Sequence, residues 1–148
     1  IEWIHTDFLT WDMGTKKADK ILLDASCSGL GVLRRHPEGK WFKKENCVAE
    51  YAQYQKQLIL QALKNLKKDG ELIYSVCSFE EEESIHHVNW LLSEFASNIE
   101  QVSPVSRLPT YFKKYVTRDN IFLIYTGNQD EMDGFGAFIV KLKQPIDV

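Results

Sequence analysis

The sequence predicts one α/β domain, and three observations lead to that prediction. Short apolar runs at residues 21–23 and 72–76 flank a long segment with helical periodicity, so strand and helix alternate along the chain. A continuous apolar run is typical of a strand that is buried on both faces in a parallel sheet. The chain has 148 residues, of which 44% are hydrophobic, and this is enough to enclose a core.

The first half of the chain predicts two strands and a helix. Residues 3–5 are expected to form a short strand ending at Asp7, and residues 21–23 the next strand, followed by a loop. Asn46 is the expected N-cap of the helix, and Gly70 is its expected C-terminal stop. Residues at i, i+3 and i+4 spacing line one face of this helix, namely Val48, Tyr51, Ala52, Gln55, Leu58, Ile59, Ala62, Leu63 and Leu66.

A second helix is predicted after the strand at residues 72–76. Ser78 and Glu81 fit a capping box at its start, and the acidic run 80–83 is explained by the preference of negative charge for a helix N-terminus. His86 and His87 are expected to be surface or partly buried structural residues. The predicted apolar face consists of Ile85, Val88, Leu92 and Phe95.

Two late strands, at residues 121–125 and 137–142, are predicted to form an antiparallel pair, because an acidic, glycine-containing segment joins them. Strand, helix, strand, helix and a terminal strand pair make up the second half of a doubly wound α/β sheet. Ligands of such sheets bind beyond the carboxyl ends of the strands. The residues that follow the predicted strands are therefore the candidates for function.

Four side chains suited to chemistry lie at those ends: Asp7, Asp24, Cys27 and Cys77. We expect them on one rim of the sheet. Small polar residues flank Cys27 and Cys77, and Cys77 precedes a predicted helix N-terminus, whose dipole favours the thiolate. On spacing alone, catalysis, simple burial and a disulfide across the rim all stay open. Cys47 is expected to be a small buried hydrophobe.

The net charge of −3 does not indicate a domain that binds nucleic acid through its overall charge. A local basic cluster, formed by Arg34, Arg35, His36 and Lys40 with Trp41 beside it, is the candidate RNA contact. Unpaired RNA is commonly bound by positive charge together with aromatic faces. The alternative is a solvated loop with Trp41 packed inward.

Several classes of protein are excluded by the sequence. No apolar run has the length of a membrane span, and the N-terminus resembles neither a signal nor a transit peptide. The three cysteines are odd in number and widely spaced, which argues against a disulfide framework and against a zinc site. We therefore expect a reduced, cytoplasmic protein without a bound metal.

Four motifs together resemble the Nop2/Sun (RsmB-type) family of RNA cytosine 5-methyltransferases. They are DASCSGLG at residues 24–31, RRHPEGKW at 34–41, DGELIYSVCSFEEEE at 69–83 and DGFGAFIVKLK at 133–143. The resemblance covers nearly the whole chain. Two positions depart from the usual pattern: Ser26 stands where most members have proline, and Val76 stands where threonine is usual.

The resemblance implies a role for each rim residue. Cys77 would add to carbon 6 of cytosine as the covalent nucleophile, and Cys27 would serve the release of the methylated RNA. Asp24 would lie between S-adenosylmethionine and the target base and help to polarise the ring. Asp7 would accept from the adenine amino group of the cofactor.

The resemblance also implies the C-terminal part of a Rossmann-like, S-adenosylmethionine-dependent methyltransferase fold, with a mostly parallel sheet and a terminal antiparallel strand pair. The first cofactor-binding strands and any RNA-binding module would then be absent from residues 1–148. We expect these residues alone to be inactive and to bind the cofactor weakly. Ribosomal RNA is the expected substrate, in the cytoplasm or, in a eukaryote, the nucleolus.

Three alternatives remain at this point. The first is a methyltransferase for transfer RNA, which the sequence cannot separate from one for ribosomal RNA. The second is a non-catalytic RNA-binding or assembly module on the same scaffold, for which the loss of the proline at Ser26 is an argument. The third is a thiol-redox protein that uses Cys27 and Cys77, although no Cys-x-x-Cys motif supports it.

Overall fold

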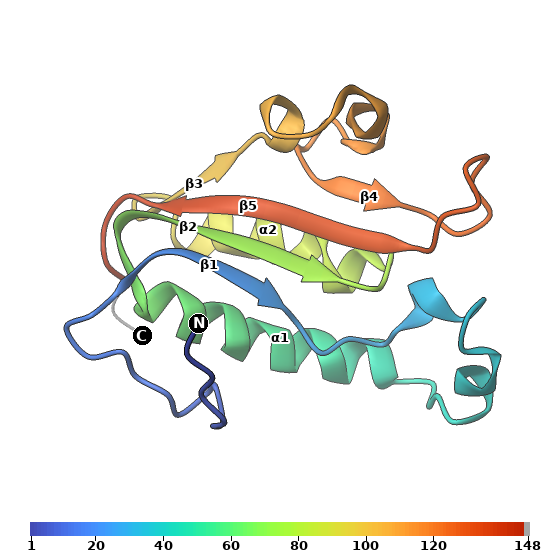
Figure 1. The fold of residues 1–148 in the computed structure, drawn as a ribbon, viewed down its shortest axis with the longest axis horizontal. Coiled ribbons are helices and arrows are strands. Elements are labelled where there is room, and N and C mark those ends of the chain that lie inside the picture. The colour runs from blue at the N-terminus through green and yellow to red at the C-terminus, as the bar shows by residue number, and fades with distance from the viewer. Residues whose placement is uncertain (147–148) are drawn as a thin grey trace.

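A computed structural model describes residues 1–146 of the chain as a five-stranded mixed sheet with two α-helices (Figure 1). The strands are ordered β1-β2-β5-β3, and β4 also pairs with β5. β1 and β2 are parallel, whereas β5 is antiparallel to β2, β3 and β4, so among residues 1–146 the sheet is mixed and not mostly parallel as expected. The strands are β1 (Ala18–Asp24), β2 (Leu66–Val76), β3 (Ile99–Val102), β4 (Phe122–Ile124) and β5 (Phe135–Leu142).

The helices α1 (Cys47–Lys64) and α2 (Ile85–Glu94) cover one face of the sheet. Side chains alternate between the two faces of a strand. Leu72, Tyr74 and Val76 of β2 accordingly pack into the core against the helices. The other face carries an apolar groove of about 440 Å³, and its lining residues include Leu22, Ile73, Pro104, Leu108, Phe122 and Phe135.

The structure confirms the predicted strands at residues 21–23 and 72–76, the helix between them, and the late antiparallel pair. One detail is wrong: β1 is not buried on both faces. Within residues 1–146 it pairs only with β2 and lies at the sheet edge, so Leu22 is 70% exposed. β3 escaped sequence analysis because its four residues, two of them polar, carry too little pattern.

The predicted strand at residues 3–5 is wrong, because that segment pairs with no strand among residues 1–146. Residues 1–17 are irregular chain beside α1 (Figure 1). They are held by bonds to the C-terminal end of that helix, where Asn65 accepts from the Met13 amide (2.9 Å) and Gln61 donates to the Trp11 carbonyl. A strand requires a hydrogen-bonded neighbour, which an apolar run alone does not supply.

Both predicted helix boundaries need correction. α1 ends at Lys64 rather than near Gly70, because the Asn65 amide closes the last turn and β2 begins at the next residue. α2 begins at Ile85, and the Ser78 hydroxyl accepts from the Glu80 amide (3.2 Å) instead of forming the predicted capping box. Within residues 1–146, no helix is long and apolar enough to cross a membrane.

Candidate active site

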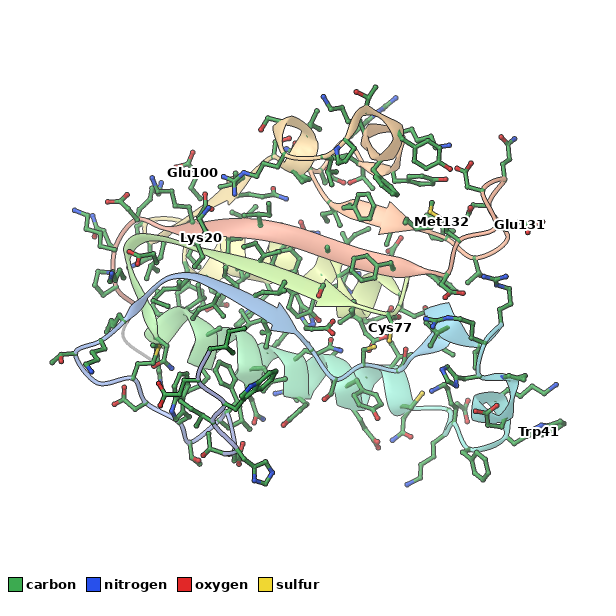
Figure 2. All side chains as sticks on the ribbon, in the orientation of Figure 1. Lys20, Trp41, Cys77, Glu100, Glu131 and Met132 are labelled. Atoms are coloured by element: carbon green, nitrogen blue, oxygen red, sulfur yellow. The ribbon has the colours of Figure 1, made fainter. Side chains whose placement is uncertain are left out.

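The two parallel strands bring both thiols to one edge of the sheet. Asp24 ends β1 and lies opposite Ser75 in the register of the pair, so the residues that follow the two strands are neighbours. The Cys27 and Cys77 sulfurs are 3.1 Å apart, and both cysteines are free and partly buried. Figure 2 shows Cys77 at the carboxyl end of β2, beside the chain that leaves β1. The predicted meeting of the two cysteines is confirmed.

The contact makes the two thiols unequal. The hydrogen bond to Cys77 and burial raise the pKa of Cys27 above its usual range. The same hydrogen bond lowers the pKa of Cys77, against an opposing effect of burial and of the nearby carboxylates of Asp24 and Glu83. Of the two thiols, Cys77 is therefore the one whose thiolate the contact favours. The thiolate is the nucleophilic form of cysteine, so Cys77 is the better nucleophile of the two.

Asp24 is exposed at the rim, as predicted. Its Oδ1 accepts a hydrogen bond from the Ser75 hydroxyl (3.0 Å). This bond across the two strands fixes the carboxylate beside the thiols. The groove on the open face of the sheet also has Asp24 and Ser75 in its lining, so the carboxylate stands where groove and thiol rim meet.

Below the thiols lies a buried polar network that sequence analysis missed. The Glu83 carboxylate is fully buried and accepts from the Ser28 amide (2.8 Å), the Ser28 hydroxyl (2.5 Å) and the Gln55 side-chain amide (2.9 Å). The interpretation of the whole acidic run as helix-terminal charge is therefore wrong for Glu83. One signal was present in the sequence: Gln55 is a polar residue on the apolar face of α1.

His87 extends this network. Its Nε2 lies 2.9 Å from the Gln55 side-chain oxygen, and its ring meets the Tyr74 ring edge-on at 5.7 Å. The Nδ1 atom is buried without a hydrogen-bond partner in the described part of the chain. Burial, followed by the charge of Lys56, lowers the pKa of His87 to about 4, so the ring is neutral at pH 7. His87 is thus a fully buried residue, while His86 is exposed as expected.

Close backbone contacts hold the cysteine loops together. The Gly31 amide donates to the Cys77 carbonyl (3.1 Å), and the Gly134 amide donates to the Gly31 carbonyl (2.8 Å). A Cβ atom at Gly31 would lie 2.1 Å from the Gly134 oxygen, so no side chain fits there. Gly31 of the DASCSGLG motif and Gly134 of the DGFGAFIVKLK motif are therefore required by the same packing.

The basic cluster lies on an exposed loop. Arg34 and Arg35 both contact the Asp133 carboxylate, and His36 lies 3.4 Å from Glu38. These ion pairs partly neutralise the cluster. The sequence left two possibilities for Trp41, contact with RNA or inward packing. The structure excludes inward packing, because the side chain is exposed.

Trp41 is 77% exposed, and the Lys40 ammonium lies 4.7 Å from its ring centre. Figure 2 shows Trp41 at the outer end of the loop. Phe42 is equally exposed, and the Lys43 ammonium reaches back to the Ser28 carbonyl. Sequence analysis did not single out Phe42 and Lys43. A pair of exposed aromatic side chains beside lysines is suited to stacking with unpaired bases.

Asp7 is not brought to the rim. Its carboxylate accepts from the Leu9 amide (3.0 Å) within an exposed turn. The turn precedes the residues that bind the C-terminal end of α1, away from Asp24. Cys47, at the first turn of α1, is partly buried.

Two known proteins with similar sequences carry the same name. A Shewanella oneidensis protein named Ribosomal RNA small subunit methyltransferase B is 35% identical over 137 residues, which cover 90% of this chain and 30% of that protein. A Klebsiella pneumoniae protein of the same name is 40% identical over 80 residues, covering 54% of this chain and 19% of that protein. The chain thus spans less than a third of the length of these relatives.

Solved structures agree in fold. NSun6 from Pyrococcus horikoshii, solved with SFG, matches 95% of this chain and 34% of its own at a TM-score of 0.76 and 24% identity. A methyltransferase homolog protein from Pyrococcus horikoshii matches 86% of this chain and 40% of its own at a TM-score of 0.63 and 25% identity. These likenesses confirm the predicted α/β methyltransferase fold.

Residues 3–143 match the family model described as 16S rRNA methyltransferase RsmB/F. That match spans nearly the whole chain and includes all four motifs and both rim cysteines. It confirms the resemblance to the Nop2/Sun (RsmB-type) methyltransferases. The chain belongs to the RsmB/F family of 16S rRNA methyltransferases.

Proposed function

We propose that this chain is the C-terminal part of the catalytic domain of an RNA cytosine C5-methyltransferase, and that the whole protein takes its methyl group from S-adenosylmethionine. The single observation that carries the proposal is the 3.1 Å contact between the Cys27 and Cys77 thiols at the carboxyl ends of two parallel strands. Family membership supplies the reaction class. The names of the relatives support ribosomal RNA as the substrate, and hence a cytoplasmic site of action.

Carbon 5 of cytosine is a weak nucleophile, and the addition of a thiolate to the ring makes it a stronger one. Addition of the Cys77 sulfur to carbon 6 places electron density on carbon 5, which then attacks an electrophilic methyl group. S-adenosylmethionine supplies that methyl group. Solvent water then takes the carbon 5 proton, the bond from Cys77 to carbon 6 breaks with its electron pair on the sulfur, and aromaticity returns. Cys27, whose pKa is raised, stays a thiol, and its contact with the Cys77 sulfur suits it to stabilise that sulfur as a departing thiolate.

Asp24 is suited to bind and orient the target base. Its exposed carboxylate has one oxygen held by Ser75 and stands beside the thiol pair. A carboxylate at this place can accept from the exocyclic amine of cytosine and hold the base over Cys77. A bound cofactor is supported by NSun6 from Pyrococcus horikoshii, which shares this fold and was solved with SFG. Asp7 lies in an exposed turn. Its contact with the cofactor stays a prediction.

Methyl transfer from tritiated S-adenosylmethionine to unmodified ribosomal RNA tests the proposal. The full-length protein should place the label in 5-methylcytosine, identified by chromatography after nuclease digestion. Cys77→Ala should remove that activity, whereas Cys47→Ala, which changes a cysteine outside the rim, should retain it. RNA binding without any label in 5-methylcytosine would favour the non-catalytic scaffold, and labelling of transfer RNA alone would replace the proposed substrate.

A further inference from the structure

Glu83 differs from its neighbours in the acidic run 80–83. Its side chain is fully buried, whereas Glu81 and Glu82 are exposed. A carboxylate taken out of water loses several kcal/mol of hydration unless donors replace it. An apolar residue would fill the same space more simply. The contacts of Glu83 therefore indicate what a carboxylate does at this position.

These contacts enclose Cys27 from both sides. Glu83 accepts from the amide and the hydroxyl of Ser28, the residue after Cys27. It also accepts from the Gln55 side-chain amide, which donates in addition to the carbonyl of Ser26, the residue before Cys27 (2.9 Å). Both neighbours of the cysteine are thus attached to one buried carboxylate, directly or through Gln55.

The backbone of Glu83 is itself held by the segment that carries Cys77. The Tyr74 hydroxyl donates to the Glu83 carbonyl (3.0 Å), and Tyr74 lies on β2 three residues before Cys77. His87 fixes the orientation of Gln55: both amide hydrogens of Gln55 are donated, so its oxygen accepts from the His87 Nε2. Glu83 therefore connects the two segments that carry the thiols.

We propose that Glu83 is a positioning residue that sets the 3.1 Å approach of the Cys27 and Cys77 thiols. It acts through Ser28 and Gln55 and touches neither sulfur. Charge-assisted hydrogen bonds, such as the three that Glu83 accepts, are shorter and stronger than neutral ones, which suits them to hold a loop in one place. The catalytic meaning of this inference rests on the proposed function, but the geometry can be tested without it.

Glu83→Gln is the sharpest variant, because it keeps the shape of the side chain and replaces one acceptor by a donor. The amide nitrogen cannot accept, so at least one of the three hydrogen bonds to this side chain is lost or reversed, and the others lose their charge assistance. The hold on the Cys27 loop is thereby weakened. Loss of the thiol contact should weaken the stabilisation of the Cys77 thiolate, since the hydrogen bond to Cys27 is the largest influence on its pKa. This effect should exceed the opposite effect of removing the Glu83 charge, which by itself raises the pKa of Cys77. We expect the pH at which Cys77 reacts half-maximally with iodoacetamide to rise by about one unit, which is roughly a tenfold slower reaction at pH 7.

The measurement uses the full-length protein, with alkylation of each cysteine followed by peptide mass spectrometry. Glu82→Gln is the matched control, since Glu82 is the exposed neighbour in the same acidic run, and its Cys77 profile should equal the wild type. Cys47 in the same samples reports general unfolding. An unchanged Cys77 profile in Glu83→Gln would overturn the positioning role, even if the melting temperature falls, because a merely structural residue changes stability alone.

If Glu83→Gln does not fold, Ser28→Ala decides instead. It removes one of the three donors and leaves the Ser28 backbone amide in place, so a smaller shift in the same direction is expected, and no shift overturns the proposal. Alkylation needs neither RNA nor cofactor. A protein without methyl transfer would still show the shift if Glu83 positions the thiols. If Glu83→Gln keeps full methyl transfer and its Cys77 alkylation profile is unchanged, the positioning role is contradicted and the proposed function stays intact.

Discussion

Two parts of the connection between β1 and α1 are held in different ways. The thiol loop, residues 24–31, is anchored by buried contacts: Ala25 donates to the Ser75 carbonyl (2.9 Å), and Ser28 binds Glu83. The basic loop, residues 34–42, lies at the surface and is held by ion pairs to Asp133.

The difference corresponds to two kinds of task. Covalent chemistry on one carbon atom requires sulfur atoms fixed within a fraction of an ångström, and buried, fully satisfied hydrogen bonds supply that precision. Contact with RNA phosphates and unpaired bases tolerates adaptable side chains and benefits from their exposure. We therefore expect substitutions in the thiol loop and its supports to change folding and thiol chemistry, and substitutions in the basic loop to change RNA affinity alone.

Gly31→Ala should have the largest effect on the thiol loop. Its new Cβ would lie 2.1 Å from the Gly134 oxygen and 2.9 Å from the Cys77 oxygen, both backbone atoms that cannot move independently. We expect a loss of about 3 kcal/mol in the free energy of unfolding, measured by urea denaturation. Gly29→Ala is the control: Gly29 has a φ of +66°, but its new Cβ would make only ordinary contacts, the nearest at 3.8 Å, so this variant should lose only about 1 kcal/mol. Equal losses would show that packing against Gly134 is not what fixes the loop.

Acidification should destabilise the support below the thiols through His87. Its pKa is about 4 in the folded protein and 6.5 without the fold, so the unfolded chain binds a proton more tightly. Stability is therefore complete above pH 6.5 and falls as the pH drops towards 4, by roughly 2 kcal/mol between pH 7.5 and pH 5. Urea denaturation at both pH values tests this. His87→Gln should remove most of this difference, whereas exposed His86→Gln should keep it, and the opposite pattern would contradict the account.

The basic loop should give the smallest effect, confined to RNA binding. Replacing Arg34 and Arg35 together by alanine removes two cations, and we expect about tenfold weaker binding of single-stranded RNA. The slope of log affinity against log salt should fall by roughly 1.4, at about 0.7 for each lost phosphate contact. Lys67→Ala, at the other end of the sheet, is the control and should leave the slope unchanged. An unchanged slope in the double variant would move the RNA contact elsewhere.

The difference between the two loops also explains what the sequence could predict. Strands and helices with a clear apolar pattern, such as β1, α1 and β2, follow from neighbouring residues, and two parallel strands necessarily bring Cys27 and Cys77 to one edge. The roles expected of the two cysteines follow from the family resemblance of their motifs and not from periodicity. The basic loop was found from its charge, which is also a local property.

The support of the thiol loop could not be predicted in this way. Glu83 bonds to Ser28, 55 positions away, and to Gln55, 28 positions away. No local pattern distinguishes Glu83 from Glu81 and Glu82, so all were attributed to the helix terminus. The expected strand at residues 3–5 failed for a related reason, because a strand depends on a partner that a local apolar run does not reveal.

Covalent trapping tests the central claim, the division of labour between the two thiols, most directly. The full-length protein is incubated with S-adenosylmethionine and RNA that carries 5-fluorocytosine, whose fluorine cannot leave as a proton does. We predict a protein–RNA adduct on a denaturing gel for the wild type and for Cys27→Ser, and none for Cys77→Ser. An adduct that persists in Cys77→Ser and disappears in Cys27→Ser, or no adduct at all while RNA still binds, would contradict the account.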